Sequence, residues 1–313
     1  MRLPCSVGPR LEAALQRPCI AQGRFVQSRR FSKANIANAP PSRDGRTDNA
    51  RSEADGDGFG AALGGGTAIV SGGSRGIGLA IASRLAQHGI SCTLVGRNEE
   101  KLQAAVETVS QAAKVSETGR TSATCRYVLG DVRDEATWAT LFKNTPDTRY
   151  LINSAGVSHH SFLARMTPAS IRDVLDINLY GTVLGCRAAL RAWAREPVQD
   201  RCIVNVSSLL AVQGGYGASA YAASKAGVVA LTRSLVDEGK TRQIRANVIL
   251  PGYIESDMTA SISDARRTDL INRIPLRRFG LTDEVADAAL FLVRNKYANN
   301  CMLNLDGGLS VAG

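Results

Sequence analysis

A tyrosine and a lysine four residues apart are the side chains best suited to acid–base chemistry in this sequence. Tyr221 and Lys225 lie in a stretch, 220–236, whose apolar spacing predicts a helix, so both side chains share one helix face. A nearby ammonium group favours the ionised phenol and lowers its pKa from the usual ~10. Ser208 ends a predicted strand and can donate a hydrogen bond to a substrate oxygen. These residues suit proton transfer to an oxygen that gains negative charge.

A glycine-rich turn follows the first predicted strand. It runs from Ser71 to Gly78, with glycines at 72, 76 and 78, where the backbone can turn sharply and approach a ligand closely. A helix is predicted to begin at the end of this turn. Because a helix N-terminus offers free N–H groups and a positive dipole, the turn predicts a pyrophosphate-binding site.

Alternating strand and helix patterns position these residues. Short β-prone runs are separated by segments of helical periodicity, which favours parallel β-α-β crossovers. We therefore expect a single α/β domain with a Rossmann-like doubly wound parallel sheet of about seven strands and helices on both faces. The predicted strands are 67–71, 91–95, 125–129, 150–153, 202–206, 244–250 and 302–305, and the predicted helices are 76–88, 99–113, 135–143, 171–193, 220–236 and 284–293.

The G-x-x-x-G-x-G spacing of the turn resembles that of the short-chain dehydrogenase/reductase superfamily, and the resemblance covers residues 67–313. A set of four residues is similar to the family's Asn-Ser-Tyr-Lys tetrad in identity, order and spacing: Asn178, Ser208, Tyr221 and Lys225. The resemblance implies that Tyr221 donates a proton and that Ser208 binds the substrate oxygen. It also implies that Lys225 binds the nicotinamide ribose and that Asn178 holds a water linked to Lys225.

The same resemblance implies a set of cofactor-binding residues. The pair 131–132 matches the family's adenine-binding position, and the segment 251–256 matches the one beside the nicotinamide. Ser154 departs from the family's usual second asparagine in N-N-A-G. The expected cofactor-binding residues are Gly72, Ser74, Arg75, Gly76, Ile77, Gly78, Arg97, Asp131, Val132, Asn153, Ala155, Gly156, Tyr221, Lys225, Pro251, Gly252, Ile254 and Ser256.

Two arginines indicate which nicotinamide cofactor is used. An NAD-preferring enzyme usually places an acid after the second strand, whereas this chain has Arg97 there. A guanidinium group suits the 2′-phosphate because it makes forked, charge-assisted contacts. Arg75 in the glycine turn is a second candidate. The sequence therefore predicts NADP(H), and the alternative is that both arginines are solvated surface residues.

Within the superfamily, the stretches 205–208, 221–227, 247–259 and 274–280 most resemble the 3-oxoacyl-[acyl-carrier-protein] reductases. This implies reduction of a carrier-bound 3-oxoacyl thioester to the (3R)-3-hydroxyacyl form by a homo- or hetero-tetramer. An acidic carrier needs a basic surface near the site. Arg242 matches a docking position of the family, and the looser candidates are Arg195, Arg201 and Lys240. Asn300 replaces a glycine of the family, and asparagine tolerates the left-handed conformation better than most residues.

Two alternative functions remain open. The first is a carbonyl, quinone or hydroxysteroid reductase that uses the same tetrad, because the loops after the strands set the substrate. The second is a non-catalytic NADP-binding subunit of a hetero-oligomer. The intact tetrad argues against the second.

Composition excludes several other classes. The 313 residues include seven cysteines without a C-x-x-C pair and only three histidines, so neither a disulfide framework nor a catalytic metal site is expected. Aromatic residues make up 5%, which argues against a stacking surface for nucleic acid. The apolar runs are shorter than the ~18 residues of a membrane span.

Much of the net charge of +10 lies at the N-terminus. Residues 1–33 contain seven basic side chains and one acid, a composition typical of a mitochondrial presequence. Residues 34–66, rich in glycine towards their end, are expected to be a disordered linker. We therefore expect an NADP-binding reductase domain at 67–313 in the mitochondrial matrix. The alternative is a basic tail without a targeting role.

Overall fold

The computed structural model describes residues 66–114 and 123–311. Seven strands form one parallel sheet in the order β3-β2-β1-β4-β5-β6-β7, which confirms the predicted fold class. The expected presequence and nearly all of the expected linker lie outside the described residues. The strands are β1 (Thr67–Ser71), β2 (Ser91–Gly96), β3 (Cys125–Leu129), β4 (Thr148–Asn153), β5 (Arg201–Val206), β6 (Ile244–Pro251) and β7 (Met302–Leu305).

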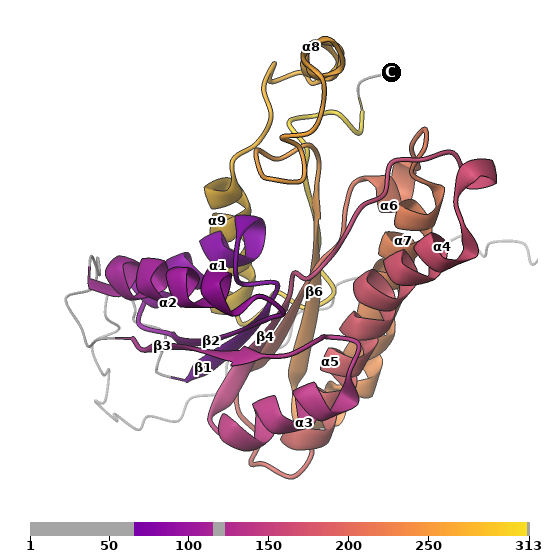
Figure 1. The fold of residues 1–313 in the computed structure, drawn as a ribbon. Coiled ribbons are helices and arrows are strands. Elements are labelled where there is room, and N and C mark those ends of the chain that lie inside the picture. The colour runs from indigo at the N-terminus through magenta and orange to yellow at the C-terminus, as the bar shows by residue number, and fades with distance from the viewer. Residues whose placement is uncertain (1–65, 115–122, 312–313) are drawn as a thin grey trace, which may run out of the picture. The chain divides into compact units, whose positions relative to one another are not determined.

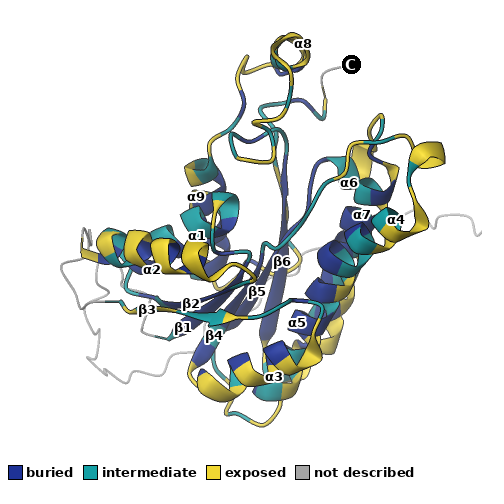
Figure 2. Ribbon diagram, in the orientation of Figure 1, coloured by how far each residue is buried: buried dark blue, intermediate teal, exposed yellow. Residues whose placement is uncertain are grey.

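Helices cover both faces of the sheet (Figure 1). One face carries α1 (Gly76–Gln87), α2 (Glu99–Lys114) and α9 (Thr282–Arg294). The other carries α3 (Glu135–Asn144), α5 (Gly181–Trp193) and α7 (Ser219–Glu238), with α4 (Pro168–Leu175) packed against α7. The central strands of the sheet lie between the two helix layers and are almost entirely buried (Figure 2). Two apolar cores therefore hold the sheet in a fixed position beneath its loops.

The predicted long helix 171–193 is interrupted. A π-helical turn, η2 (Asp176–Tyr180), joins α4 to α5. Such turns are inserted in longer helices, and they often occur at functional sites. Asn178 lies in the middle of this turn and is fully buried.

Several short elements were not predicted. They are η1 (Leu163–Arg165), α6 (Leu210–Gln213), η3 (Lys240–Arg242) and α8 (Asp264–Arg273). The α8 helix buries only Leu270 within its ten residues and is otherwise strongly polar. It therefore lacks the regular apolar spacing from which a helix is usually predicted.

The strand order places the functional loops together. The chain moves outward from β1 to β3 on one side and from β4 to β7 on the other, so β1 and β4 are neighbours at the point where the order reverses. In open parallel sheets, ligands bind beyond the carboxyl ends of the strands at this point.

Candidate active site

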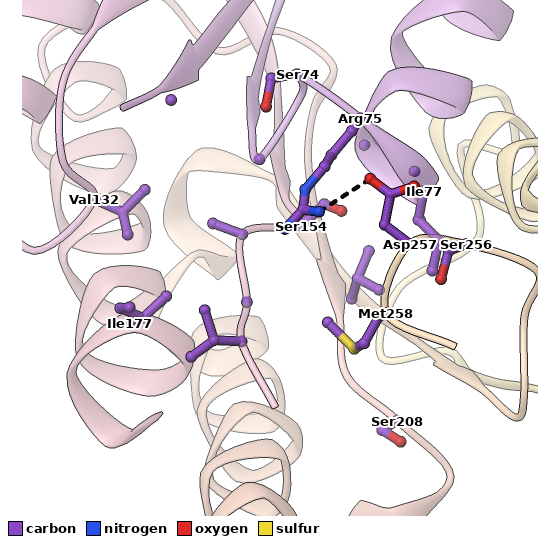
Figure 3. Close-up of a pocket in the computed structure, with 18 of the residues that line it drawn as sticks. Ser74, Arg75, Ile77, Val132, Ser154, Ile177, Ser208, Ser256, Asp257 and Met258 are labelled. Atoms are coloured by element: carbon purple, nitrogen blue, oxygen red, sulfur yellow. Dashed lines mark hydrogen bonds and ion pairs between the residues drawn. The ribbon is translucent and has the colours of Figure 1, made fainter. Parts of the chain in front are cut away.

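A cleft at the carboxyl edge of the sheet brings together most of the predicted site residues. Its lining comes from the turns after β1, β2, β3, β4, β5 and β6 and from the first turns of α7. Figure 3 labels lining residues from the turns after β1, β3, β4, β5 and β6. Of the predicted site residues, those that line it are Gly72, Ser74, Arg75, Gly76, Ile77, Gly78, Arg97, Asp131, Val132, Ala155, Gly156, Ser208, Tyr221, Lys225, Pro251, Gly252, Ile254 and Ser256. Asn153 and Asn178 lie behind this lining.

The glycine turn has the geometry of an anion cradle. Gly72 and Gly76 have φ angles of 68° and 55°, a region that glycine enters without steric cost. A β-carbon on Gly78 would lie 2.3 Å from the carbonyl oxygen of Gly72. The α1 helix behind the turn has no acid in its first turn, and its N-cap residue Arg75 makes no side-chain cap. Its first N–H groups are therefore available to a phosphate, so the residues fit a dinucleotide.

Tyr221 and Ser208 meet inside the cleft. Burial raises the pKa of Tyr221 above its ordinary value, and this effect is larger than the lowering of that pKa by the neighbouring Ser208 side chain. This direction is opposite to the lowered pKa expected from the sequence, because the site is more buried than the spacing of Tyr221 and Lys225 indicated. In the chain alone, the tyrosine is therefore held in its protonated, proton-donating form.

Lys225 is the buried cation of the site. Its Nζ donates to the carbonyl oxygen of Val206 at 2.9 Å and lies 5.9 Å from the centre of the Tyr221 ring. Burial lowers its pKa from 10.5 to about 8. Ser207 supports the same helix because its hydroxyl donates to the Lys225 carbonyl oxygen at 2.8 Å. The lysine is therefore charged near neutral pH and fixed beside the tyrosine.

Asn178 holds the loop after β4 rather than facing the cleft. Its Oδ1 accepts from the N–H of Val157 at 2.8 Å, and its Nδ2 donates to the carbonyl of Val157 at 2.9 Å and to Ser224 Oγ at 3.1 Å. A β-carbon on Gly156 would lie 3.3 Å from Asn178 Oδ1 and 3.4 Å from Lys225 Nζ. The side chain thus ties the Gly156 loop to α7, while its expected role in holding a water stays a prediction.

Asn153 also lies behind the cleft. Its side chain donates to Asn205 Oδ1 at 2.9 Å between the sheet and α5. At the end of the neighbouring strand β1, Ser71 Oγ accepts from the N–H groups of Ser154 and Ala155, which follow Asn153. Ser71 therefore joins the glycine turn to the turn after β4.

The charged residues at the cofactor end of the cleft differ in their partners. The carboxylate of Asp131 accepts from the Arg133 guanidinium at 2.7–3.1 Å, which lowers the pKa of Asp131. Arg75 pairs with Asp257 at 3.0 Å. Within 66–114 and 123–311, Arg97 forms no ion pair, and its charge contributes to the lowered pKa of Asp131.

The basic residues expected to dock a carrier lie elsewhere. Arg242 ends η3 just before β6 and donates to the carbonyl of Glu196 at 3.3 Å. It is separated from Tyr221 by roughly 25 Å of α7 helix, at the amino edge of the sheet. Arg201 is fully buried over the Trp193 ring, so its expected docking role is wrong. Arg195 and Lys240 are exposed.

The cleft also contains residues that the sequence reasoning did not select. Asp257, Met258 and Thr259 line it directly after Ser256. The other such residues are Val95, Gly96, Gly130, Ser154, Val157, Ile177, Val206 and Ser207. The position of 257–259 beside an expected binding residue was the available signal. Asn300 has a φ of 60°, which lies in the left-handed region that asparagine tolerates better than most residues.

Two findings bear on other kinds of site. In the part of the chain that the structure describes, no group of three or more His, Cys, Asp or Glu side chains is placed to hold a metal. No helix of that part combines the length and apolar character needed to cross a membrane.

Comparison with known proteins identifies relatives over about three quarters of the chain. The family described as Enoyl-(Acyl carrier protein) reductase matches residues 72–310. Carbonyl reductase family member 4 of Xenopus laevis is 38% identical over 77% of this chain and 97% of its own length. The 3-oxoacyl-[acyl-carrier-protein] reductase of Rattus norvegicus is 37% identical over the same shares.

A solved structure shares the fold. The crystal structure of a putative short-chain alcohol dehydrogenase from Sinorhizobium meliloti has a TM-score of 0.71 and 29% identity, covering 79% of this chain and 97% of the other. Together with the glycine turn and the meeting of Ser208, Tyr221 and Lys225 in one cleft, these matches establish that the chain belongs to the short-chain dehydrogenase/reductase family of oxidoreductases.

Proposed function

We propose that this chain catalyses the NADPH-dependent reduction of 3-oxoacyl-[acyl-carrier-protein] to (3R)-3-hydroxyacyl-[acyl-carrier-protein] in mitochondrial fatty acid synthesis. The observation that carries the proposal is the meeting of Tyr221, Ser208 and Lys225 in one cleft with the glycine turn. Relatives from Rattus norvegicus and Bos taurus are named 3-oxoacyl-[acyl-carrier-protein] reductase, at 37% and 36% identity. These names support the choice of substrate.

The residues of the cleft divide the reaction between them. When bound, NADPH supplies the hydride that reduces the ketone carbon. Tyr221 donates its proton to the oxygen that gains negative charge, and Ser208 donates a hydrogen bond to the same oxygen. The Lys225 ammonium stabilises the phenolate that Tyr221 becomes. Asn178 keeps the Gly156 loop and α7 at a fixed separation through its three hydrogen bonds.

NADP(H) is the proposed cofactor on the basis of charge. Arg97 follows β2, where an NAD enzyme usually has an acid, and it lines the cleft without an ion-pair partner among the described residues. Arg75 lines the same end of the cleft. A 2′-phosphate beside these two guanidinium groups would gain forked hydrogen bonds.

The partner proposals follow from the substrate. We infer that an acyl carrier protein delivers the thioester and that Arg242 helps to dock it, within a homo- or hetero-tetramer in the mitochondrial matrix. Arg242 lies at the opposite edge of the sheet from the cleft of its own chain. Docking there therefore serves a cleft supplied by another subunit.

A second candidate function is general carbonyl reduction. It is supported by relatives named carbonyl reductase family member 4 in Xenopus laevis and Danio rerio, at 38% and 36% identity. The same tetrad would reduce small ketones or quinones without a carrier.

Substrate turnover by the full chain distinguishes the two candidates. NADPH oxidation is measured with acetoacetyl-[acyl-carrier protein], with free ketones and quinones, and with NADH in place of NADPH. Fast, NADPH-specific turnover of the carrier thioester is expected. Slow turnover of the thioester beside fast turnover of quinones or ketones would instead favour the general reductase.

A further inference from the structure

An ion pair crosses the cofactor cleft between two segments that are far apart in sequence. Arg75, in the glycine turn, places Nη1 3.0 Å from Oδ2 of Asp257, in the segment 252–259 that follows β6. Figure 3 shows the Arg75 side chain pointing from its turn towards Asp257. The two side chains are 57% and 66% exposed, so a dissolved anion can reach them and compete for the same N–H groups.

The other arginine of the cleft is not restrained in this way. Arg97 lines the same cleft, and within the described ranges no carboxylate lies at ion-pair distance from it. Of the two cations that the proposed function assigns to the 2′-phosphate, Arg97 therefore has no ion-pair partner among the described residues, whereas Arg75 is already paired with a carboxylate. A phosphate carries more charge than a carboxylate and accepts the same forked contacts.

We propose that Asp257 is a specificity-determining residue, which competes with the 2′-phosphate for Arg75 and so limits the preference for NADP(H) over NAD(H). The inference rests on the proposed use of NADP(H). Because exposed ion pairs contribute little free energy, removing the competing carboxylate should tighten the binding of a 2′-phosphate by about two- to fivefold.

The segment that carries Asp257 has its own support, so it does not depend on the ion pair for its fold. Thr259 Oγ1 donates to the carbonyl of Ile254 at 2.7 Å. The N–H of Glu255 donates to the carbonyl of Gly280 at 2.8 Å, and the N–H of Gly280 donates to the carbonyl of Tyr253 at 2.9 Å. Asp257→Asn removes the charge, keeps the side-chain size and leaves these bonds in place.

Calorimetric titration of the full chain tests the proposal with two ligands that differ only in the 2′-phosphate: adenosine 2′,5′-bisphosphate and AMP. Asp257→Asn is expected to tighten binding of the bisphosphate by about two- to fivefold and to leave AMP unchanged. Asp287→Asn is the matched control. Asp287 pairs with Arg84 at 2.6 Å, and Arg84 lies on α1, the helix whose N-cap position is Arg75.

The Arg75→Gln background shows whether competition is the cause. Without the arginine, Asp257→Asn should have no effect on bisphosphate binding. A gain that persists in Arg75→Gln, an equal gain for AMP or in Asp287→Asn, or no gain at all would overturn the proposal. Equal affinity of the wild type for both ligands would contradict the NADP(H) assignment itself. A gain in bisphosphate affinity in Asp257→Asn that is lost in the Arg75→Gln background would still support the competition between Asp257 and the 2′-phosphate.

Discussion

Replacing Lys225 with methionine separates the cost of burying an ammonium group from its value in catalysis. Burial lowers the pKa of Lys225 from 10.5 to about 8. Between these two values the unfolded chain binds the proton and the folded chain does not, so the stability of the wild type rises with pH in this window. The full difference corresponds to about 3 kcal/mol.

The expected effect is a change in the stability difference between two proteins. From pH 7 to pH 9.5, the unfolding free energy of the wild type should rise by about 2 kcal/mol relative to Lys225→Met. The variant also loses the hydrogen bond from Nζ to Val206, worth about 1 kcal/mol. This loss changes the stability difference between wild type and Lys225→Met by the same amount at pH 7 and at pH 9.5. The turnover of Lys225→Met should be lost at both pH values.

Urea unfolding at one protein concentration measures these differences. Lys101→Met, which removes an exposed lysine on α2, is the control and should show no such pH dependence. A stability difference between wild type and Lys225→Met that is the same at both pH values would refute the reasoning, because the lysine would then titrate alike in the folded and unfolded chains.

Four further predictions concern the site and the N-terminus. Tyr221→Phe should reduce turnover by at least about 100-fold with little change in melting temperature; full activity would exclude Tyr221 as the proton donor. Arg97→Asp should shift the kcat/KM ratio towards NADH, and an unchanged ratio would mean that Arg97 does not contact the 2′-phosphate. Gly78→Ala should weaken NADPH binding and lower the melting temperature, because its β-carbon would lie 2.3 Å from a backbone oxygen; wild-type values for both would argue against this. Isolated mitochondria should import the full chain but not a chain without residues 1–31, and import of the shortened chain would contradict a presequence.

The sheet could be predicted because its signal is local. Strands β1, β3 and β7 have the bounds expected from the sequence, and the other four differ by one or two residues at an end. These strands are short β-prone runs bounded by turn residues. The glycine turn could be predicted from its place between the first strand and the first helix. The meeting of Ser208 with Tyr221 was expected from the resemblance of these residues to the family's tetrad.

Properties that depend on burial could not be predicted in the same way. Arg201 has the sequence context of a surface arginine, but the fold buries it over the Trp193 ring. The pKa of Tyr221 was expected to fall, and burial raises it. The partner of Arg75 lies 182 residues away in sequence, and the partners of Asn178 lie 21 and 46 residues away. No local pattern therefore identifies them.

The π-helical turn at Asp176–Tyr180 has a consequence for how this site can change. Each residue of an α-helix advances the chain by about 100°, so the residue added by the turn shifts the rotational phase between α4 and α5. Deleting one residue would restore a continuous α-helix but would rotate either Asn178 or the buried face of α5 out of place. Point substitutions cannot produce or remove this offset. The position of the asparagine therefore depends on the number of residues in this segment, and single-residue deletions between 170 and 182 should be tolerated far less than substitutions.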